Sequence, residues 1–137
     1  MRTQTNSTPK WIIIYLWLTA VITVGACIAG YFMPDSLLAT WPALKAAGAL
    51  SLAGPLGLFL SRNVATAVVT VFSLVKKNSD MIKIVLILRI FSDGFDLINN
   101  LIADNMQVAI MGGIMCLIEI IAFVKMNKKL KNSKKTL

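Results

Sequence analysis

The residues of this chain that could carry chemistry lie in one apolar stretch, residues 82–101, which contains Arg89, Asp93 and Asp96. On a helix that turns about 100° per residue, these three and Asn100 fall within roughly 60° and share one narrow stripe. Each charge near the centre of a bilayer costs from about 2.5 kcal/mol upward, so three are retained only where they are paired and face protein or water. The stripe is therefore the candidate functional site.

The composition indicates a membrane protein of one domain. The chain has 137 residues, 57% of them hydrophobic, and its apolar residues come in long blocks. The formal net charge is +8, but most Lys and Arg residues lie near the chain ends and in one loop, without interleaved aromatic residues. This pattern favours a membrane topology signal over nucleic-acid binding. With no His and two isolated Cys, the sequence predicts no metal site and no disulfide framework, and it specifies no cofactor.

The apolar blocks predict an all-α, polytopic membrane protein, a bundle of four transmembrane helices over residues 11–126. A polar tail, residues 1–10, precedes the bundle, and a basic tail, residues 127–137, follows it. The expected spans are residues 11–33, 55–75, 81–102 and 106–126.

The second span has two possible registers. A span that starts near Leu44 and ends near residue 60 would leave residues 64–75 too short to cross the membrane. A span over residues 55–75 has full length and places Arg62 where it can meet the acids of the third span. We prefer this register, which makes residues 36–53 an extra external interfacial or re-entrant segment. The alternative is a long helix from Leu44, kinked at Pro55.

Local signals refine these elements. Near the two ends of the first span, aromatic residues are placed for an interfacial belt: Trp11, Tyr15 and Tyr31. Ser79 or Asp80 is suited to cap the third helix. Small residues of the fourth span recur at spacings of three and four, which allows close helix contact: Ala109, Gly112, Gly113 and Cys116.

The charged residues of different helices match in depth. With a rise of about 1.5 Å per residue, Arg62 lies about 4 to 5 Å outside the bilayer centre, close to Asp93 at about 2 Å and Asp96 at about 7 Å. Arg89 and Glu119 both lie about 4 Å on the inner side. We therefore expect Arg62 to pair with Asp93 and Asp96, and Arg89 to pair with Glu119.

Three acids that face two guanidinium groups leave a surplus of one negative charge. Because an unpaired buried carboxylate is costly, one carboxyl should hold a proton, or the site should hold a cation. The alternative is that the ion pairs only fix the register between otherwise apolar helices. The candidate ligand or proton site comprises Arg62, Asn63, Arg89, Asp93, Asp96 and Glu119.

Two short motifs carry a family resemblance. The Arg62-Asn63 pair in the second helix and the run Asp93-Gly94-Phe95-Asp96 in the third, within four helices with short later turns, resemble the DoxX-like small bacterial membrane proteins over residues 11–126. The resemblance implies the four-helix fold in a bacterial inner membrane more than it implies an activity. The redox partnership suggested for some DoxX proteins is not matched, because this chain has no vicinal cysteines.

Three functions fit these residues. We expect a non-enzymatic inner-membrane protein that binds a proton or a small apolar or anionic ligand at the charged site. One alternative is an ion or proton pathway in a homo-oligomer, since four helices enclose little lumen. Another is an enzyme on an apolar substrate with Asp93 or Asp96 as acid and base, which a deep apolar pocket beside Asp93 would favour.

Charge asymmetry sets the expected orientation. Four spans place residues 1–10, the Lys76-Lys77 turn and the lysine-rich tail on one side of the membrane, and this side should be the cytoplasm. Both termini are then cytoplasmic.

Cysteine labelling tests this topology. A membrane-impermeant reagent added outside should modify Ser36→Cys and Asn105→Cys, because both positions lie in external loops. It should not reach Ser79→Cys or Ser133→Cys. Labelling of position 79 from outside would overturn the four-span topology.

Overall fold

The computed structural model describes residues 8–33 and 55–135, and these residues form four helices. In chain order the helices are α1 (Lys10–Phe32), α4 (Pro55–Val75), α5 (Ser79–Ile102) and α6 (Met106–Lys135). The expected all-α class is confirmed for these residues. The interfacial segment expected over residues 36–53, and the alternative helix start at Leu44, fall outside them.

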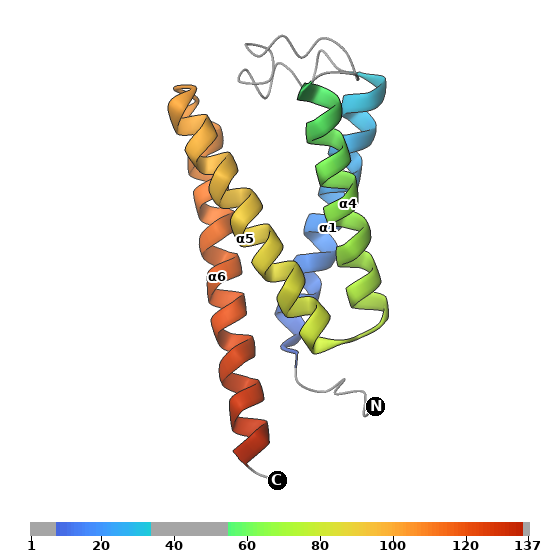
Figure 1. Cartoon of the computed structure of the whole chain (residues 1–137), viewed down its shortest axis with the longest axis vertical. Helices are drawn as coiled ribbons and strands as arrows, with labels where there is room; N and C mark the ends of the chain where they lie inside the picture. The colour runs from blue at the N-terminus through green and yellow to red at the C-terminus, as the bar shows by residue number, and fades with distance from the viewer. Residues whose placement is uncertain (1–7, 34–54, 136–137) are drawn as a thin grey trace.

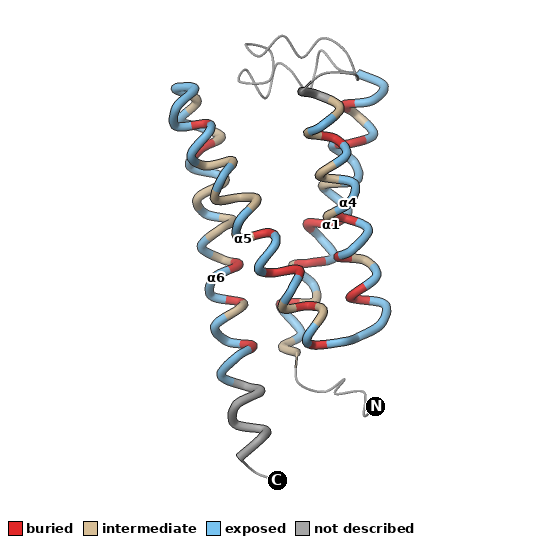
Figure 2. The backbone as a smooth tube through the Cα atoms, viewed as in Figure 1, coloured by how far each residue is buried: buried red, intermediate tan, exposed pale blue. Residues whose placement is uncertain are grey.

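Three of the helices are long and apolar enough to cross a membrane, over Lys10–Phe32, Gly57–Val75 and Met106–Lys128. Helix α5 has 24 residues, a similar length, but its middle carries Arg89 and two aspartates. Exposed residues occur along all four helices, pale blue in Figure 2, and many of them are large and apolar. Such surfaces are costly in water and suit a hydrocarbon solvent.

Two helix ends differ from the sequence expectation. The residue that caps α5 is Asn78, whose Oδ1 accepts hydrogen bonds from the backbone N–H groups of Asp80 at 2.9 Å and Met81 at 3.3 Å. The expected cap at Ser79 or Asp80 is therefore wrong, because the extended backbone of Asn78 already aims its amide at the first turn. Helix α6 continues past residue 126 to Lys135, because lysines are good helix formers and suit the negative end of the helix dipole.

The helices form two pairs, α1 with α4 and α5 with α6, which meet at one end and diverge toward the other (Figure 1). We call the meeting end the basic end, after the lysines Lys10, Lys76, Lys77, Lys125 and Lys128. All four helices contribute to the apolar core there: Ile12, Leu16, Leu74, Ile82, Val85, Leu86, Ala122 and Met126. The core thus ties the two pairs together mainly at the basic end.

Small residues bring α6 close to α5, as the sequence predicts. A Cβ atom added at Gly112 would lie 3.6 Å from the backbone oxygen of Asp93 and 3.6 Å from the backbone nitrogen of Leu97. One turn further along α6, the Cys116 thiol donates a hydrogen bond to the backbone oxygen of Ile90 at 3.7 Å. Ala109 is buried as well. This close contact sets where the α5 and α6 side chains meet.

The Gly112 contact can be tested by side-chain size. Gly112→Ala should be tolerated, because its Cβ would make ordinary contacts, whereas Gly112→Leu should destabilise the fold by about 1 to 3 kcal/mol through overpacking. Gly25→Leu is the matched control, because a Cβ there meets nothing within 4 Å. Unfolding of the purified protein in mixed detergent micelles measures the free energies. Equal loss from Gly112→Leu and Gly25→Leu would contradict the packing argument.

Candidate functional site

Glu119 of α6 is the most deeply buried charged residue among those described, with none of its surface exposed. Its Oε1 accepts a hydrogen bond from Arg89 Nε of α5 at 2.6 Å and another from the Tyr15 hydroxyl of α1 at 3.0 Å. Its Oε2 is buried, and none of the described residues donates a hydrogen bond to it. The expected pairing of Arg89 with Glu119 is confirmed, and three helices meet at this carboxyl group.

Arg89 also contacts a second carboxylate. Its Nη2 lies 3.7 Å from Asp93 Oδ2, one turn further along the same helix. The expected pairing of Asp93 with Arg62 is wrong, because residues four apart on a helix lie on the same face and Arg89 is the nearer cation. One guanidinium group therefore contacts the carboxylates of both Asp93 and Glu119.

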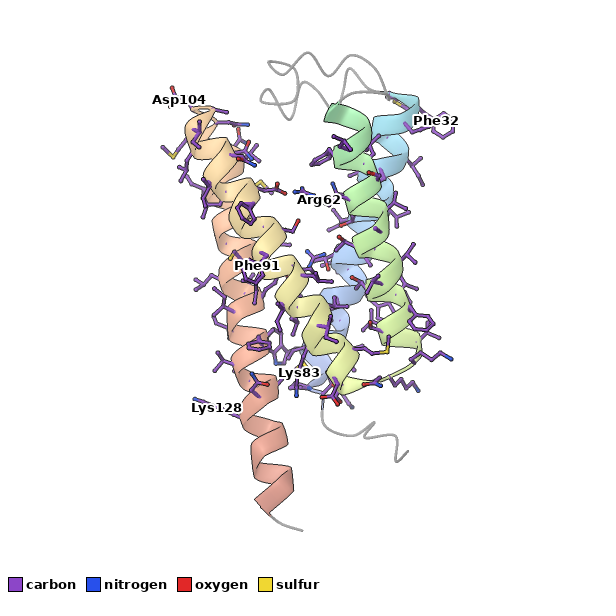
Figure 3. All side chains as sticks on the ribbon, viewed as in Figure 1. Phe32, Arg62, Lys83, Phe91, Asp104 and Lys128 are labelled. Atoms are coloured by element: carbon purple, nitrogen blue, oxygen red, sulfur yellow. The ribbon has the colours of Figure 1, made fainter. Side chains whose placement is uncertain are left out.

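Arg62 of α4 and Asp96 of α5 form the second ion pair, which joins the two helix pairs beyond the shared core. Arg62 Nη2 donates to both carboxylate oxygens of Asp96, at 2.9 and 3.0 Å. In Figure 3 the Arg62 side chain extends from α4 toward α5. Its guanidinium also lies over the Phe59 ring, 5.6 Å from the ring centroid. The expected pairing is thus confirmed for Asp96, and this pair is more accessible, with side chains 39% and 22% exposed.

Asn63 and Asn100, two of the polar residues singled out in the sequence, donate hydrogen bonds from their side-chain amides to backbone oxygens of their own helices. Asn63 donates to the Phe59 carbonyl oxygen at 2.9 Å, so the structure does not bring it to the charged groups. Asn100 donates to the Asp96 carbonyl oxygen at 2.7 Å and accepts from the amide of Asn105 at 3.3 Å, which ties down the turn before α6. The charged site therefore comprises five of the six expected residues.

The site also contains Tyr15, which the sequence reasoning assigned to the aromatic belt. That assignment is wrong, because the hydroxyl of Tyr15 points into the bundle and reaches Glu119. The available signal was periodicity: Tyr15 follows Ile12 by three residues and precedes Thr19 by four, and both of these are buried. A tyrosine on the inner face of a helix needs a polar partner for its hydroxyl.

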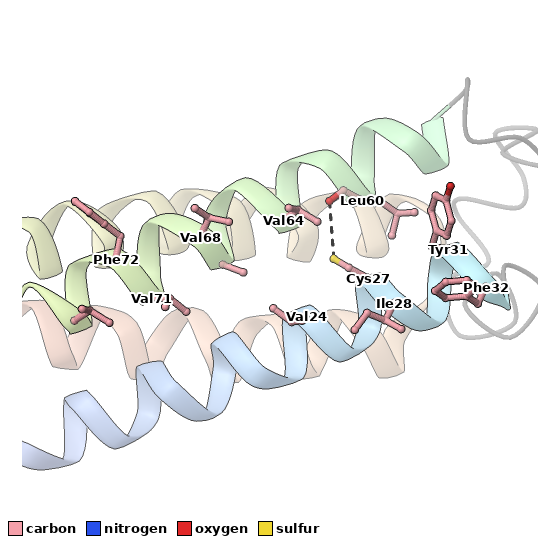
Figure 4. A pocket seen from close by; sticks show the side chains of 12 residues that line it. Val24, Cys27, Ile28, Tyr31, Phe32, Leu60, Val64, Val68, Val71 and Phe72 are labelled. Carbon is pink, nitrogen blue, oxygen red and sulfur yellow. Dashed lines mark hydrogen bonds between the residues drawn. The ribbon is translucent and has the colours of Figure 1, made fainter.

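An apolar cavity of about 650 Å³ lies between α1 and α4 (Figure 4). It is bordered by the contact of the Cys27 thiol with the Leu60 carbonyl oxygen at 3.9 Å. Its lining is Val24, Cys27, Ile28, Tyr31, Phe32, Leu60, Val64, Ala67, Val68, Val71, Phe72 and Val75. The cavity is therefore not beside Asp93 or Asp96, where an acid and base would act on an apolar substrate.

No family model, curated protein or solved structure matches this chain. The geometry of the site suits the binding of a proton or a small polar group at a buried carboxyl, while two guanidinium groups balance the remaining negative charge.

The two ion pairs should differ in their effect on stability. Arg89→Leu leaves the fully buried Glu119 without its cation and should cost about 3 to 5 kcal/mol of unfolding free energy. Arg62→Leu should cost less, because the side chains of that pair are only partly buried, whereas Glu119 is fully buried.

The double variant Arg89→Leu/Glu119→Leu should recover much of the loss, because it leaves no isolated charge in the core. Unfolding in mixed micelles, with circular dichroism as the signal, measures all three variants. Equal losses from Arg89→Leu and Arg62→Leu would contradict the assignment of Arg89 as the central cation.

Proposed function

We propose that this chain is a multi-pass protein of a bacterial inner membrane that binds a proton or a small ligand at the charged site between its helices. The observation that carries the proposal is the state of Glu119, one oxygen of which is saturated by two donors while the other is buried without one. Ion pairs that only fixed helix register would be most stable with every oxygen satisfied. An open acceptor on a buried carboxyl supports a site that takes up a further group.

Four spans follow if α5 crosses the membrane together with the three more apolar helices. Supporting this, Arg89 and Asn100 in its middle and outer half are buried, and Asp93 and Asp96 are ion-paired, so the charges within the span face protein. Its outward side carries exposed apolar residues such as Phe91 and Phe95. The polar stripe thus faces inward and an apolar surface faces lipid.

The basic end supports an orientation with both termini in the cytoplasm. Lys125 Nζ lies 5.4 Å from the centroid of the Trp11 ring, and Lys76 Nζ lies 5.5 Å from that of Phe72. Lysines that extend along aromatic rings at a helix end are typical of a membrane interface. Because Ser79 is only 4% exposed, the exposed Asn127 is the better inner position for cysteine labelling.

A proton or ion pathway in an oligomer is the second candidate, and the gradient of exposure along the site favours it. Exposure falls from the Arg62–Asp96 pair, at 39% and 22%, through Asp93 at 21%, to Glu119 at 0%. Titratable groups that step from accessible to buried are what a proton pathway needs. The likeness to DoxX-like proteins agrees with either candidate and remains a prediction.

Measuring proton flux across a lipid bilayer distinguishes a protein that only binds a proton from one that conducts protons. In liposomes that contain the purified protein and a trapped pH-sensitive dye, binding alone should give no response to an imposed pH gradient. A pathway should give a response that Glu119→Gln abolishes. Truncation after Asn127 is the matched control, because it removes lysines beyond the spans and should leave fold and binding unchanged.

The binding proposal itself predicts a loss without unfolding. Asp93→Asn and Glu119→Gln keep side-chain shape and should keep the fold, but they should reduce proton uptake by the purified protein, measured by titration in detergent. If proton uptake were unchanged in both variants, the binding proposal would be wrong, and the ion pairs would only fix the register between the helices.

A further inference from the structure

The Asp93 and Glu119 carboxyl groups contact the same guanidinium group. Arg89 reaches Glu119 Oε1 through Nε at 2.6 Å and Asp93 Oδ2 through Nη2 at 3.7 Å. Arg89 therefore holds both carboxyl groups, one from its own helix and one from α6. Two ionised carboxylates offer each other no donor, which agrees with the unpartnered Oε2 of Glu119.

The surplus negative charge belongs to these two acids. Among the five charged residues of the site, Asp96 has a cation of its own, since Arg62 donates to both of its oxygens. Arg89 is left to balance Asp93 and Glu119 together. Two acids at close range in a poorly hydrated site do not both ionise, because the second charge would meet the first without enough water to screen it.

We propose that Asp93 and Glu119 hold one proton between them, as an acid and carboxylate pair beside a permanently charged Arg89. The inference rests on the proposed buried binding site and names the proton as its ligand. A proton from water adds to one carboxylate oxygen, and the resulting O–H donates to the other carboxyl group. This hydrogen bond supplies the donor that Glu119 lacks, and the charge of the trio becomes zero.

The surroundings favour a proton over a metal cation. The guanidinium of Arg89 contacts both acids and would repel a second cation there. The other titratable or charged groups that face the pair are Tyr15 of α1, Arg62 of α4, Asp96 of α5 and Cys116 of α6. Arg62 and Asp96 largely cancel each other, Tyr15 already donates to Glu119, and the Cys116 thiol donates to a backbone oxygen.

The side chains of the two acids differ in exposure, and this difference assigns them different roles. The Asp93 side chain is 21% exposed, whereas Glu119 is fully buried. Asp93 is therefore the member that exchanges its proton with water, and Glu119 is the inner member that stabilises it. Proton exchange through Asp93 needs no opening of the core at the basic end.

Infrared spectroscopy of the protein in lipid nanodiscs tests the inference, because a protonated carboxyl has a carbonyl band that shifts in heavy water. The wild-type protein should show this band near neutral pH. Asp93→Asn and Glu119→Gln should each abolish it, because the one remaining acid pairs with Arg89 as a carboxylate. Circular dichroism confirms that each variant is folded, and Asp93→Asn, at the more exposed position, serves if Glu119→Gln fails to assemble.

The double variant Arg62→Gln/Asp96→Asn removes the outer pair without changing net charge, and the band should persist. Loss of the band in this variant alone would place the proton on the outer pair, which overturns the inference but leaves a buried proton site. Persistence in Asp93→Asn or in Glu119→Gln would overturn a shared proton. A wild-type protein with no band and no proton uptake would overturn the proposed function too.

Discussion

The interior of this protein depends on one cation, Arg89, held in an apolar bundle by two acids. A guanidinium group that is only 6% exposed needs compensation, and Glu119 and Asp93 provide it from two helices. This requirement determines how α5 and α6 lie against each other, because the acid and the guanidinium must be level. It also brings α1 into the arrangement, since Tyr15 completes the coordination of the same carboxylate oxygen.

Close helix packing and the ion pairs support each other. Gly112 lets α6 approach the backbone of α5 near Asp93, and Glu119 sits two turns further along α6, level with Arg89. A larger separation of these helices would lengthen the contact between the two charges and weaken it steeply in a medium of low dielectric constant. Helix packing at Gly112 and the Arg89–Glu119 ion pair therefore specify the same register between α5 and α6. Apolar packing alone would not determine that register.

The ion pairs that depend on the depth of residues along their helices are predictable from the sequence. The rise per residue fixes depth, so the Arg89 and Glu119 pair and the Arg62 and Asp96 pair follow from counting along helices of membrane length. Rotation of a helix about its axis is not fixed by counting, and for that reason Tyr15 and the partner of Asp93 were missed. The continuation of α6 as a helix to Lys135 was not predicted, because the membrane limits only its apolar part, whereas lysines continue a helix in water.

The divergence of the two helix pairs gives the molecule unequal stiffness along its length. At the basic end, any relative movement of the pairs exposes a core drawn from all four helices. Toward the other end, the partly exposed Arg62–Asp96 ion pair joins them among the described residues. Backbone amides near that end should therefore open at lower free energy, and the angle between the pairs can respond to lateral pressure or bilayer thickness while the core stays closed.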